Sequence, residues 1–367
     1  MSVGSSLNKS SGSKSVLSVQ TIVLAQVGWA VLALLFFLLF SVPAPGQPRP
    51  YWYSVGTSIF ETVAFITAAI LCFRNWQSPQ IVSGRNVWLC IGLGMLCYFI
   101  GNLLFSYWEL GLGIEPDVSP GDFFFVFAYI FLLLGMLLAV ISRRLNLEIW
   151  QWGVVGVIAA LGIILAYLAS APATSSTARS PFLPPAIAQT APAKPAQKTK
   201  ASPQANPTAQ PKSPTATSPA PTTTDKTLPA PAIPAEKASS PKTEDNSNVP
   251  AWAQTLEKIL APLKPFLDWF YVISDILLLI IATTLLLAFW GGRFAQSWRM
   301  IAAAAFSLYI ADIWFKYATN RLSDYQSGGL LEVFWVFSGV LFGIGAALEY
   351  DVSSRSRSRT GGRRRVT

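Results

Sequence analysis

Eight apolar segments, each about 20 residues long, limit the possible folds of this chain more than any other feature. A helix of that length crosses the hydrocarbon core of a bilayer and satisfies its own backbone N–H and C=O groups there. The sequence therefore predicts an all-α polytopic membrane protein with eight transmembrane helices. The predicted spans are residues 21–42, 54–73, 87–108, 122–142, 150–170, 266–290, 298–318 and 330–350.

The first span has a rival interpretation as a signal peptide. A retained helix is favoured, because the apolar stretch of 21–42 is longer than the usual ~7–15 residues and no A-x-A site follows it. Composition agrees with a membrane protein: 52% of the residues are hydrophobic and 12% are charged. The net charge of +9 does not indicate nucleic acid as a partner, because the basic residues lie in short loops, a linker and the tail.

The sequence carries no pattern typical of an enzyme. It has no histidine, no Gly-rich phosphate loop and no G-x-S-x-G motif. Membrane hydrolases of the ceramidase type use intramembrane His and Asp, so their chemistry is not expected here. Cys72, Cys90 and Cys97 lie inside apolar segments and form no metal-ligand or disulfide pattern. We expect a non-enzymatic protein without a metal or other cofactor.

An internal repeat divides the chain into two membrane modules. With an offset of 210 residues, the segment 88–138 matches 298–348 without gaps, and eleven of fifty-one positions are identical. Polar positions match in kind, since Asn102 corresponds to Asp312 and Asp122 to Glu332. Four helices return the chain to the same side of the membrane, so the repeats are predicted to be parallel, with four-helix units at 21–142 and 150–350.

Charge predicts the orientation in the membrane. Positively charged residues in short loops favour the cytoplasm. Eight helices place all the Arg-rich loops on one side together with both termini, which predicts a bacterial inner-membrane protein with cytoplasmic ends. The residues concerned are Arg74, Arg85, Arg143, Arg144, Arg293, Arg299 and six arginines from Arg355 to Arg365.

Four segments lie outside the predicted spans. Residues 1–20 are predicted to be a disordered cytoplasmic N-terminus. Residues 171–249 hold 16 of the 26 prolines and predict a disordered external linker, either a tolerated insertion or a spacer that contacts the cell wall. Residues 250–264 predict an amphipathic helix at the membrane interface, whose last turn Pro262 disturbs. Residues 351–367 predict a basic cytoplasmic tail that contacts anionic lipid or a protein partner.

Polar residues inside the spans predict a pocket in the outer half of the membrane. Charged groups are costly there and usually face the bundle interior or water. The predicted pocket residues are Glu61, Asn102, Tyr107, Asp275, Asp312, Trp314, Lys316, Tyr317 and Trp335. The alternative is that these groups only tie the helices together. Asp312 and Lys316 have the i,i+4 spacing of an ion pair. The acids Asp122 and Glu332 are expected at helix starts, with Asp122 in the opening SPGD.

The segment WELGLGIEPDVSPGDFFFVFAYIFLLLGML (108–137) resembles membrane sensor regions of bacterial signalling proteins that precede diguanylate cyclase or cyclic-di-GMP phosphodiesterase domains. In the second copy, Ala311-Asp312, Tyr325, Gly328, Glu332, Trp335 and Ala346-Ala347-Leu348 resemble the closing motif of those regions. Two departures concern the motif: the helix-opening Asp is Glu332, and Tyr129-Ile130-Phe131 replaces a Y-P-L. A third is that no output domain follows the last span.

This resemblance implies a sensing module that acts through a protein partner on the cytoplasmic side. The sequence does not specify an oligomeric state. Two alternatives come from other classes of protein: a small transporter or ion-coupled carrier, and a structural protein whose linker reaches the cell wall. Polar residues confined to one half of the membrane argue against the transporter, because a pathway needs polar steps at both ends.

Overall fold

The computed structural model describes residues 18–43, 49–114, 118–141, 147–171, 249–289, 295–322 and 325–363, with side chains described as far as residue 355. All of them belong to one compact unit, made of residues 1–174 and 246–367. The predicted N-terminal segment, except residues 18–20, and nearly all of the predicted linker lie outside the described residues. Within the described part of the chain the secondary structure is helical and contains no strand.

Among the described residues, eight helical stretches are long and apolar enough to cross a membrane, which confirms the predicted number of spans. The elements in chain order are α1 (Val19–Phe40), α2 (Tyr51–Gln77), α3 (Arg85–Ser106), η1 (Tyr107–Gly111), α4 (Pro120–Ile141), α5 (Ile149–Ser170), α6 (Ala251–Leu260), η3 (Ala261–Leu263), α7 (Lys264–Ala288), α8 (Ala295–Arg321), η4 (Leu330–Glu332) and α9 (Val333–Arg363).

Local chemistry explains where the observed ends differ from the predicted ones. The segment 1–20 was predicted to be disordered, but α1 begins at Val19 because the Ser18 hydroxyl accepts a hydrogen bond from the Thr21 amide. The basic tail was predicted to begin at residue 351, directly after the last span. The helix α9 instead continues to Arg363, so most of the predicted tail is helical. An i,i+4 ion pair of 2.9 Å between Asp351 and Arg355 supports this extension.

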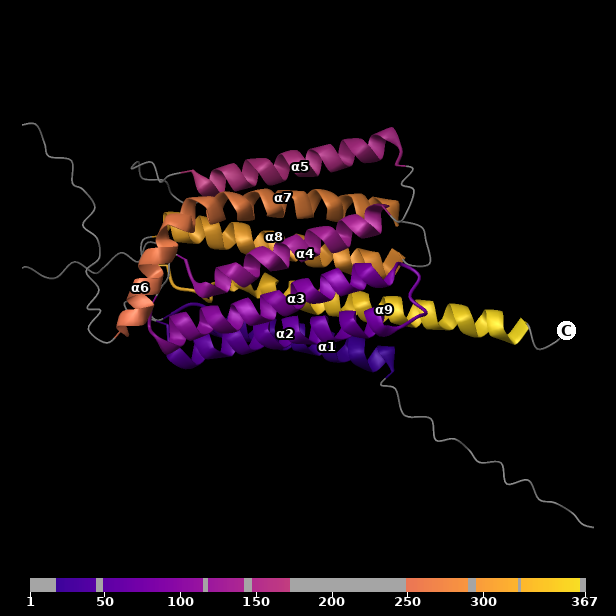
Figure 1. Cartoon of the computed structure of the whole chain (residues 1–367), viewed down its shortest axis with the longest axis horizontal. Coiled ribbons are helices and arrows are strands. Elements are labelled where there is room, and N and C mark those ends of the chain that lie inside the picture. The colour runs from indigo at the N-terminus through magenta and orange to yellow at the C-terminus, as the bar shows by residue number, and fades with distance from the viewer. Residues whose placement is uncertain are drawn as a thin grey trace, which may run out of the picture. The chain divides into compact units, whose positions relative to one another are not determined.

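The two predicted repeats form one bundle of helices that run alongside each other (Figure 1). Within the first repeat, α3 packs between α2 and α4, and within the second, α8 packs between α7 and α9. The repeats are joined by α2 with α9, by α4 with α7, and by α1 with α9. The first two interfaces are equivalent in the repeat, whereas α5, the counterpart of α1, packs on α7 and α8 of its own repeat.

The helices α2 and α7 are the second of their repeats, and α4 and α9 are the fourth. The α2–α9 and α4–α7 interfaces therefore join equivalent helices. The last three helices of each repeat, α2 to α4 and α7 to α9, are therefore parallel and related by an approximate two-fold axis along the bundle, whereas α1 and α5 do not follow it.

Equivalent residues meet at this axis. The indole rings of Trp88 and Trp298, which share one repeat position, lie 6.2 Å apart, and both are fully buried. Equivalent glycines also make equivalent close contacts inside each repeat. A Cβ on Gly135 would lie 2.9 Å from the side chain of Ile91, and one on Gly345 would lie 2.6 Å from that of Ile301. The sequence repeat is thus also a repeat of the packing.

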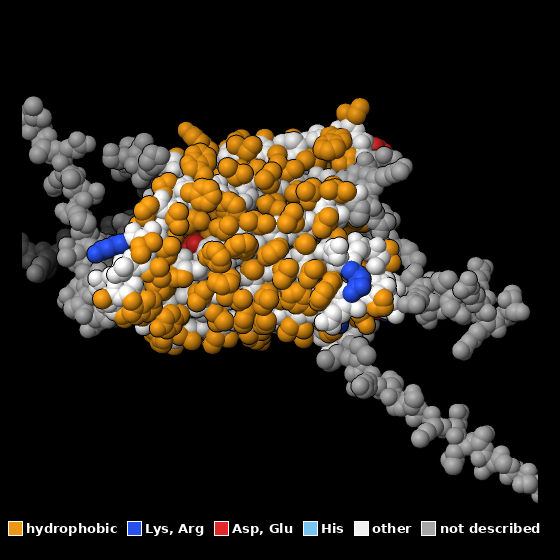
Figure 2. All heavy atoms as spheres, in the orientation of Figure 1, with side chains coloured by type: hydrophobic (Ala, Val, Ile, Leu, Met, Phe, Trp, Pro, Cys, Tyr) orange, Lys and Arg blue, Asp and Glu red, His pale blue; other side chains and the backbone are white. Residues whose placement is uncertain are grey.

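The side of the bundle in view in Figure 2 is covered with hydrophobic side chains, and Lys and Arg side chains lie near its two ends. The helices α1 and α5 are the most exposed of the spans, since only 17% and 22% of their most apolar windows are buried. A surface of this kind matches the hydrocarbon of a bilayer, because lipid replaces the protein contacts that a buried helix would need.

The short helix α6 lies across one end of the bundle (Figure 1), and we call this end the α6 end. Its Trp252 ring packs against Trp108 of η1 with the centroids 5.5 Å apart, and Ala253 is fully buried beside Trp108 and Ile114. The predicted helix 250–264 corresponds to α6 followed by the 3₁₀ turn η3, which contains Pro262. The chain then continues directly into α7, so α6 is connected to one of the pocket helices.

Candidate functional site

A cavity of about 340 Å³ lies between the two repeats, in the half of the bundle nearest the α6 end. Its walls come from α2, α3 and α4 of the first repeat and from α7, α8 and the start of α9 in the second. Lys264, which is exposed, and Asp268, whose side chain is 45% exposed, lie at the rim, so the cavity communicates with solvent at this end. Its volume is at the lower end of the range for small-molecule sites, roughly 300–1,000 Å³.

Acidic side chains dominate the polar part of the lining. Seven carboxylic acids contribute to the walls against two lysines, and aromatic rings form much of the remainder. The acids are Glu61, Glu109, Asp122, Asp268, Asp275, Asp312 and Glu332, and the lysines are Lys264 and Lys316. Most of these acids accept hydrogen bonds from, or form ion pairs with, other residues of the protein.

One polar cluster joins the two repeats deep in the cavity. The Tyr129 hydroxyl, from α4, lies 2.6 Å from Asp275 Oδ1 and 2.6 Å from Asp312 Oδ2. The Trp335 indole N–H donates to Asp312 Oδ1 at 2.7 Å. A phenol carries one proton and donates to one carboxylate at a time. The second short contact at Tyr129 therefore needs a proton from the acids themselves.

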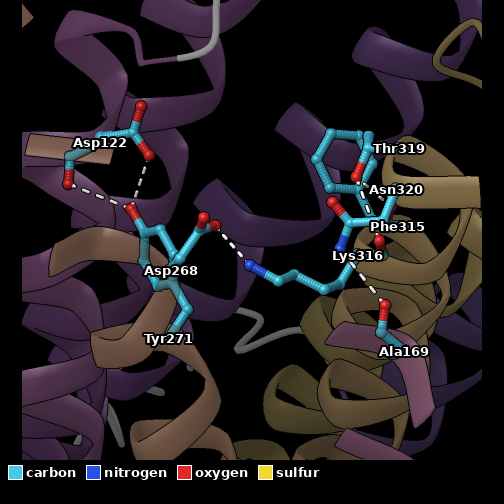
Figure 3. Close-up of polar contacts among 8 residues, drawn as sticks. All are labelled: Asp122, Ala169, Asp268, Tyr271, Phe315, Lys316, Thr319 and Asn320. Carbon is cyan, nitrogen blue, oxygen red and sulfur yellow. Dashed lines mark hydrogen bonds and ion pairs between the residues drawn. The ribbon is translucent and has the colours of Figure 1, made fainter. Parts of the chain in front are cut away.

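A second cluster lies near the rim, where residues of α4, α7 and α8 meet (Figure 3). The Tyr271 hydroxyl donates to Asp122 Oδ1 at 2.7 Å, and the Lys316 ammonium forms an ion pair with Asp268. The predicted ion pair between Lys316 and Asp312 is therefore wrong. Lys316 extends across to α7, where the partly exposed Asp268 is a better-hydrated partner, while Asp312 is already bonded on both oxygens.

The two helix-start acids act in the backbone turns that precede their helices. Asp122 Oδ2 accepts from the Ser119 amide at 2.7 Å and so caps α4 from its first turn. Glu332 is only 2% exposed, so it does not stand in water as a simple cap would. Its two carboxylate oxygens accept the amides of Gly328 at 2.6 Å and Gly329 at 2.9 Å. Gly328 has a φ of +98°, a backbone conformation that favours glycine.

The Glu332 turn is also attached to the first repeat. The Tyr53 hydroxyl of α2 donates to the Gly328 carbonyl at 2.7 Å. The Arg49 guanidinium donates to the Ser327 carbonyl at 2.6 Å and to the Ser41 carbonyl at 3.2 Å. The start of α9 is thus tied to the connection between α1 and α2.

The structure places six of the nine predicted pocket residues in the cavity wall and three elsewhere. Those in the wall are Glu61, Asn102, Asp275, Asp312, Lys316 and Trp335. Tyr107, Trp314 and Tyr317 do not line it. Tyr107 is 55% exposed at the start of η1, and the rings of Trp314 and Tyr317 pack on each other with centroids 5.9 Å apart.

The predicted pocket did not include Tyr129, Asp268 and Tyr271, although the family resemblance had named Tyr129 in its motif. A signal was present for the last two, because residues 268, 271 and 275 have the i, i+3, i+7 spacing of one helical face. Tyr129 gave no such signal, since its repeat equivalent is Gly339 and it lies in an apolar run. The difference between Tyr129 and Gly339 also makes the cavity asymmetric. The tyrosine reaches across towards α7, whereas the glycine brings α9 against Ala64 of α2.

The opposite half of the bundle is closed by packed aromatic and aliphatic side chains. Phe289 stacks on Trp298 with centroids 5.0 Å apart, and Trp298 in turn contacts Trp88. Ser83 accepts from the Trp88 indole at 2.8 Å and donates to Glu349 at 2.7 Å. The lining of the cavity includes none of these residues.

No metal centre or disulfide forms among the residues described here. They contain no group of three or more His, Cys, Asp and Glu side chains that could hold a metal ion. Cys72, Cys90 and Cys97 are free thiols. Comparison with family models, with curated proteins and with solved structures gave no match for this chain.

Proposed function

We propose that this integral membrane protein is a non-enzymatic, sensor-like or receptor-like module that binds a small molecule in the cavity between its repeats. The observation that carries the proposal is the position of the cavity relative to α9. Glu332, which ends η4 directly before α9, and Trp335, in the first turn of α9, both line the cavity. The helix α9 then passes through the bundle and ends beyond its opposite end (Figure 1).

A ligand in the cavity would contact both repeats at once. The α4–α7 side is joined through Tyr129, and the α2–α9 side through the turn that Arg49 and Tyr53 hold. A ligand that favours one spacing of the repeats therefore shifts α9 relative to α2, provided that it binds the two arrangements with different affinity. The far end of α9 is then the output, and a cytoplasmic protein is the proposed partner.

The orientation belongs to the same proposal. With the Arg-rich loops and both termini in the cytoplasm of a bacterium, the α6 end and the cavity face outward and the end of α9 faces inward. The transporter alternative is less well supported, because packed side chains around Trp88 and Trp298 separate the cavity from the opposite end.

The test combines a binding measurement with a distance measurement at the far end. Purified protein is screened by thermal unfolding against amines, amino acids, carboxylates and sugars, and compounds that raise the melting temperature are retained. In a background with the three cysteines replaced by alanine, nitroxide labels at the exposed positions of Gln77→Cys and Arg355→Cys report the distance between α2 and α9. Electron–electron double resonance then gives that distance with and without the compound.

The expected result is a ligand-dependent change in the distance distribution, because binding energy in the cavity is coupled to the position of α9. A compound that stabilises the protein without changing the distance between the labels would contradict the signalling role. The protein would then bind the compound without transmitting a signal through α9. If no compound of any class stabilises the protein, the cavity is only a packing feature and the proposal fails.

A further inference from the structure

Glu61 is the pocket acid whose partners are missing. It is 9% exposed and lines the cavity from α2. Among the residues that the structure describes, nothing donates a hydrogen bond to its carboxyl group or forms an ion pair with it. Burial reduces the hydration of this carboxyl group, and no donor among the described residues replaces the lost water. The carboxyl group is therefore open to a partner from outside the protein, which a ligand in the cavity can supply in place of water.

The other acids of the cavity differ from Glu61 in this respect. Asp122 has Tyr271, Asp268 has Lys316, and Glu332 has two backbone amides. The remaining pair shares Tyr129 and Trp335. Glu109, the seventh acid of the lining, is not without an interaction either. Glu61 is therefore the one acid of the lining that the described residues leave to be matched by a ligand. A ligand with one cationic centre fits this pattern better than a polyamine, which needs several free acids.

Charge around Glu61 selects the same sign of ligand. Glu61 lies within electrostatic range of two further acids, Glu332 and Glu109. An anionic ligand at this position would add like charge in a region of low dielectric, and its attraction to the lysines is reduced because Lys316 is already paired. A cation is favoured, and the dispersed acids provide no group that could coordinate a metal ion among the described residues.

The wall beside Glu61 is aromatic. Phe65 lies one helical turn further along α2 and stacks on Tyr98 with centroids 5.1 Å apart, and Phe125 lies 5.7 Å beyond Tyr98. All three line the cavity. Aromatic faces attract an ammonium group and also bury an apolar body. A ligand that carries both parts would therefore place its charge at Glu61 and its body along these rings.

We infer that the cavity binds a small organic monoamine, an ammonium group on an apolar body, with Glu61 as its counter-ion. The inference rests on the proposed function, because it names the class of molecule that the same cavity takes. The ammonium N–H groups donate to the Glu61 carboxylate, and the aromatic wall of α2, α3 and α4 contacts the remainder of the molecule.

The probes are 2-phenylethylamine and two matched analogues, 2-phenylethanol and 3-phenylpropionate, which are neutral and anionic. Each is titrated into wild-type protein and into Glu61→Gln, and binding is measured by melting temperature and by isothermal titration calorimetry. Glu257→Gln, on α6 and outside the cavity wall, removes the same charge and serves as the matched control. Partition of the probes into detergent is the same for all three proteins.

We expect the amine to stabilise wild-type protein and the Glu257→Gln variant, and to bind Glu61→Gln roughly tenfold or more weakly, as for loss of a charge-assisted hydrogen bond. Without ligand, Glu61→Gln should melt no lower than wild type, because the exchanged group has no partner to lose. A Glu61→Asp variant keeps the charge and should still prefer the amine over the alcohol.

Three results would overturn the inference, and they are distinguishable. If Glu61→Gln melts lower without ligand but binds the amine as wild type does, Glu61 ties helices together and is not the counter-ion. If the alcohol or the acid stabilises wild type and the amine does not, the ligand class is wrong while the proposed function stands. If no probe and no screened compound stabilises wild type, the proposed function fails as well.

Discussion

Replacing Gly339 with alanine perturbs the interface between the repeats at a point of close backbone contact. Gly339 lies on α9 against α2, and a Cβ there would lie 2.9 Å from the Cβ and 3.0 Å from the carbonyl carbon of Ala64. Carbon atoms in contact prefer separations of about 3.5–4.0 Å. The backbone of α2 cannot turn away as a side chain can, so α9 and α2 must separate by several tenths of an ångström.

The expected cost follows from two opposed terms. Overpacking of a close contact costs about 1–3 kcal/mol, whereas glycine to alanine in a helix gains up to about 1 kcal/mol. The net effect of Gly339→Ala is therefore a loss of about 0–3 kcal/mol. Gly153 on α5 is the matched control, because a Cβ there meets nothing within 4 Å. Gly153→Ala keeps only the helix term, so it should be neutral or stabilising.

The assay is thermal unfolding of both variants in the same detergent, followed by tryptophan fluorescence. Gly339→Ala should melt below wild type, and Gly153→Ala at or above it. Equal melting temperatures for the two variants would refute the reasoning, since it would mean that α2 and α9 are not in close contact at this position.

Three further variants test other contacts by the same unfolding assay. Tyr129→Phe removes the hydroxyl that two acids share and should cost about 1–3 kcal/mol; an unchanged melting temperature would show that this bridge between the repeats is not formed. Trp298→Ala empties a fully buried site at the two-fold axis and should cost about 3–5 kcal/mol, whereas Trp150→Ala, at a side chain 59% exposed on α5, should have little effect. Arg49→Gln removes the guanidinium that holds the turn 325–329 and should speed amide hydrogen exchange in that turn selectively; exchange that rises equally throughout the bundle would indicate general destabilisation instead.

The candidate site was only partly predictable from the sequence. Glu61, Asp275 and Asp312 could be assigned to the interior because charged groups in a membrane avoid lipid. Their partners could not be assigned, because spacing along one helix gives no information about a neighbouring helix. Spacing favoured Asp312 for Lys316, but the structure pairs Lys316 with Asp268.

Helix rotation explains why three of the predicted pocket residues do not line the cavity. Successive residues point about 100° apart around a helix, so a residue at the right depth faces either the cavity or another side according to the rotation of its helix. Tyr107, at the correct depth, is exposed in the π-helical turn that ends α3. Packing against neighbouring helices sets that rotation. The sequence of a helix with hydrophobic residues on every face does not indicate which face points inward.

The sequence by itself determined the eight helices, the repeat that relates the last three helices of each half, and the interior position of Glu61, Asp275 and Asp312. Hydrocarbon forces this outcome, because a backbone in a membrane must satisfy its own hydrogen bonds and a charge must avoid lipid. Only the tertiary structure decided that Tyr129 bridges to the second repeat while its equivalent, Gly339, lets α9 close on α2. Only the tertiary structure left Glu61 without a partner. These features depend on which helices are neighbours and how each is rotated, and both are set by side-chain packing between segments far apart in the chain.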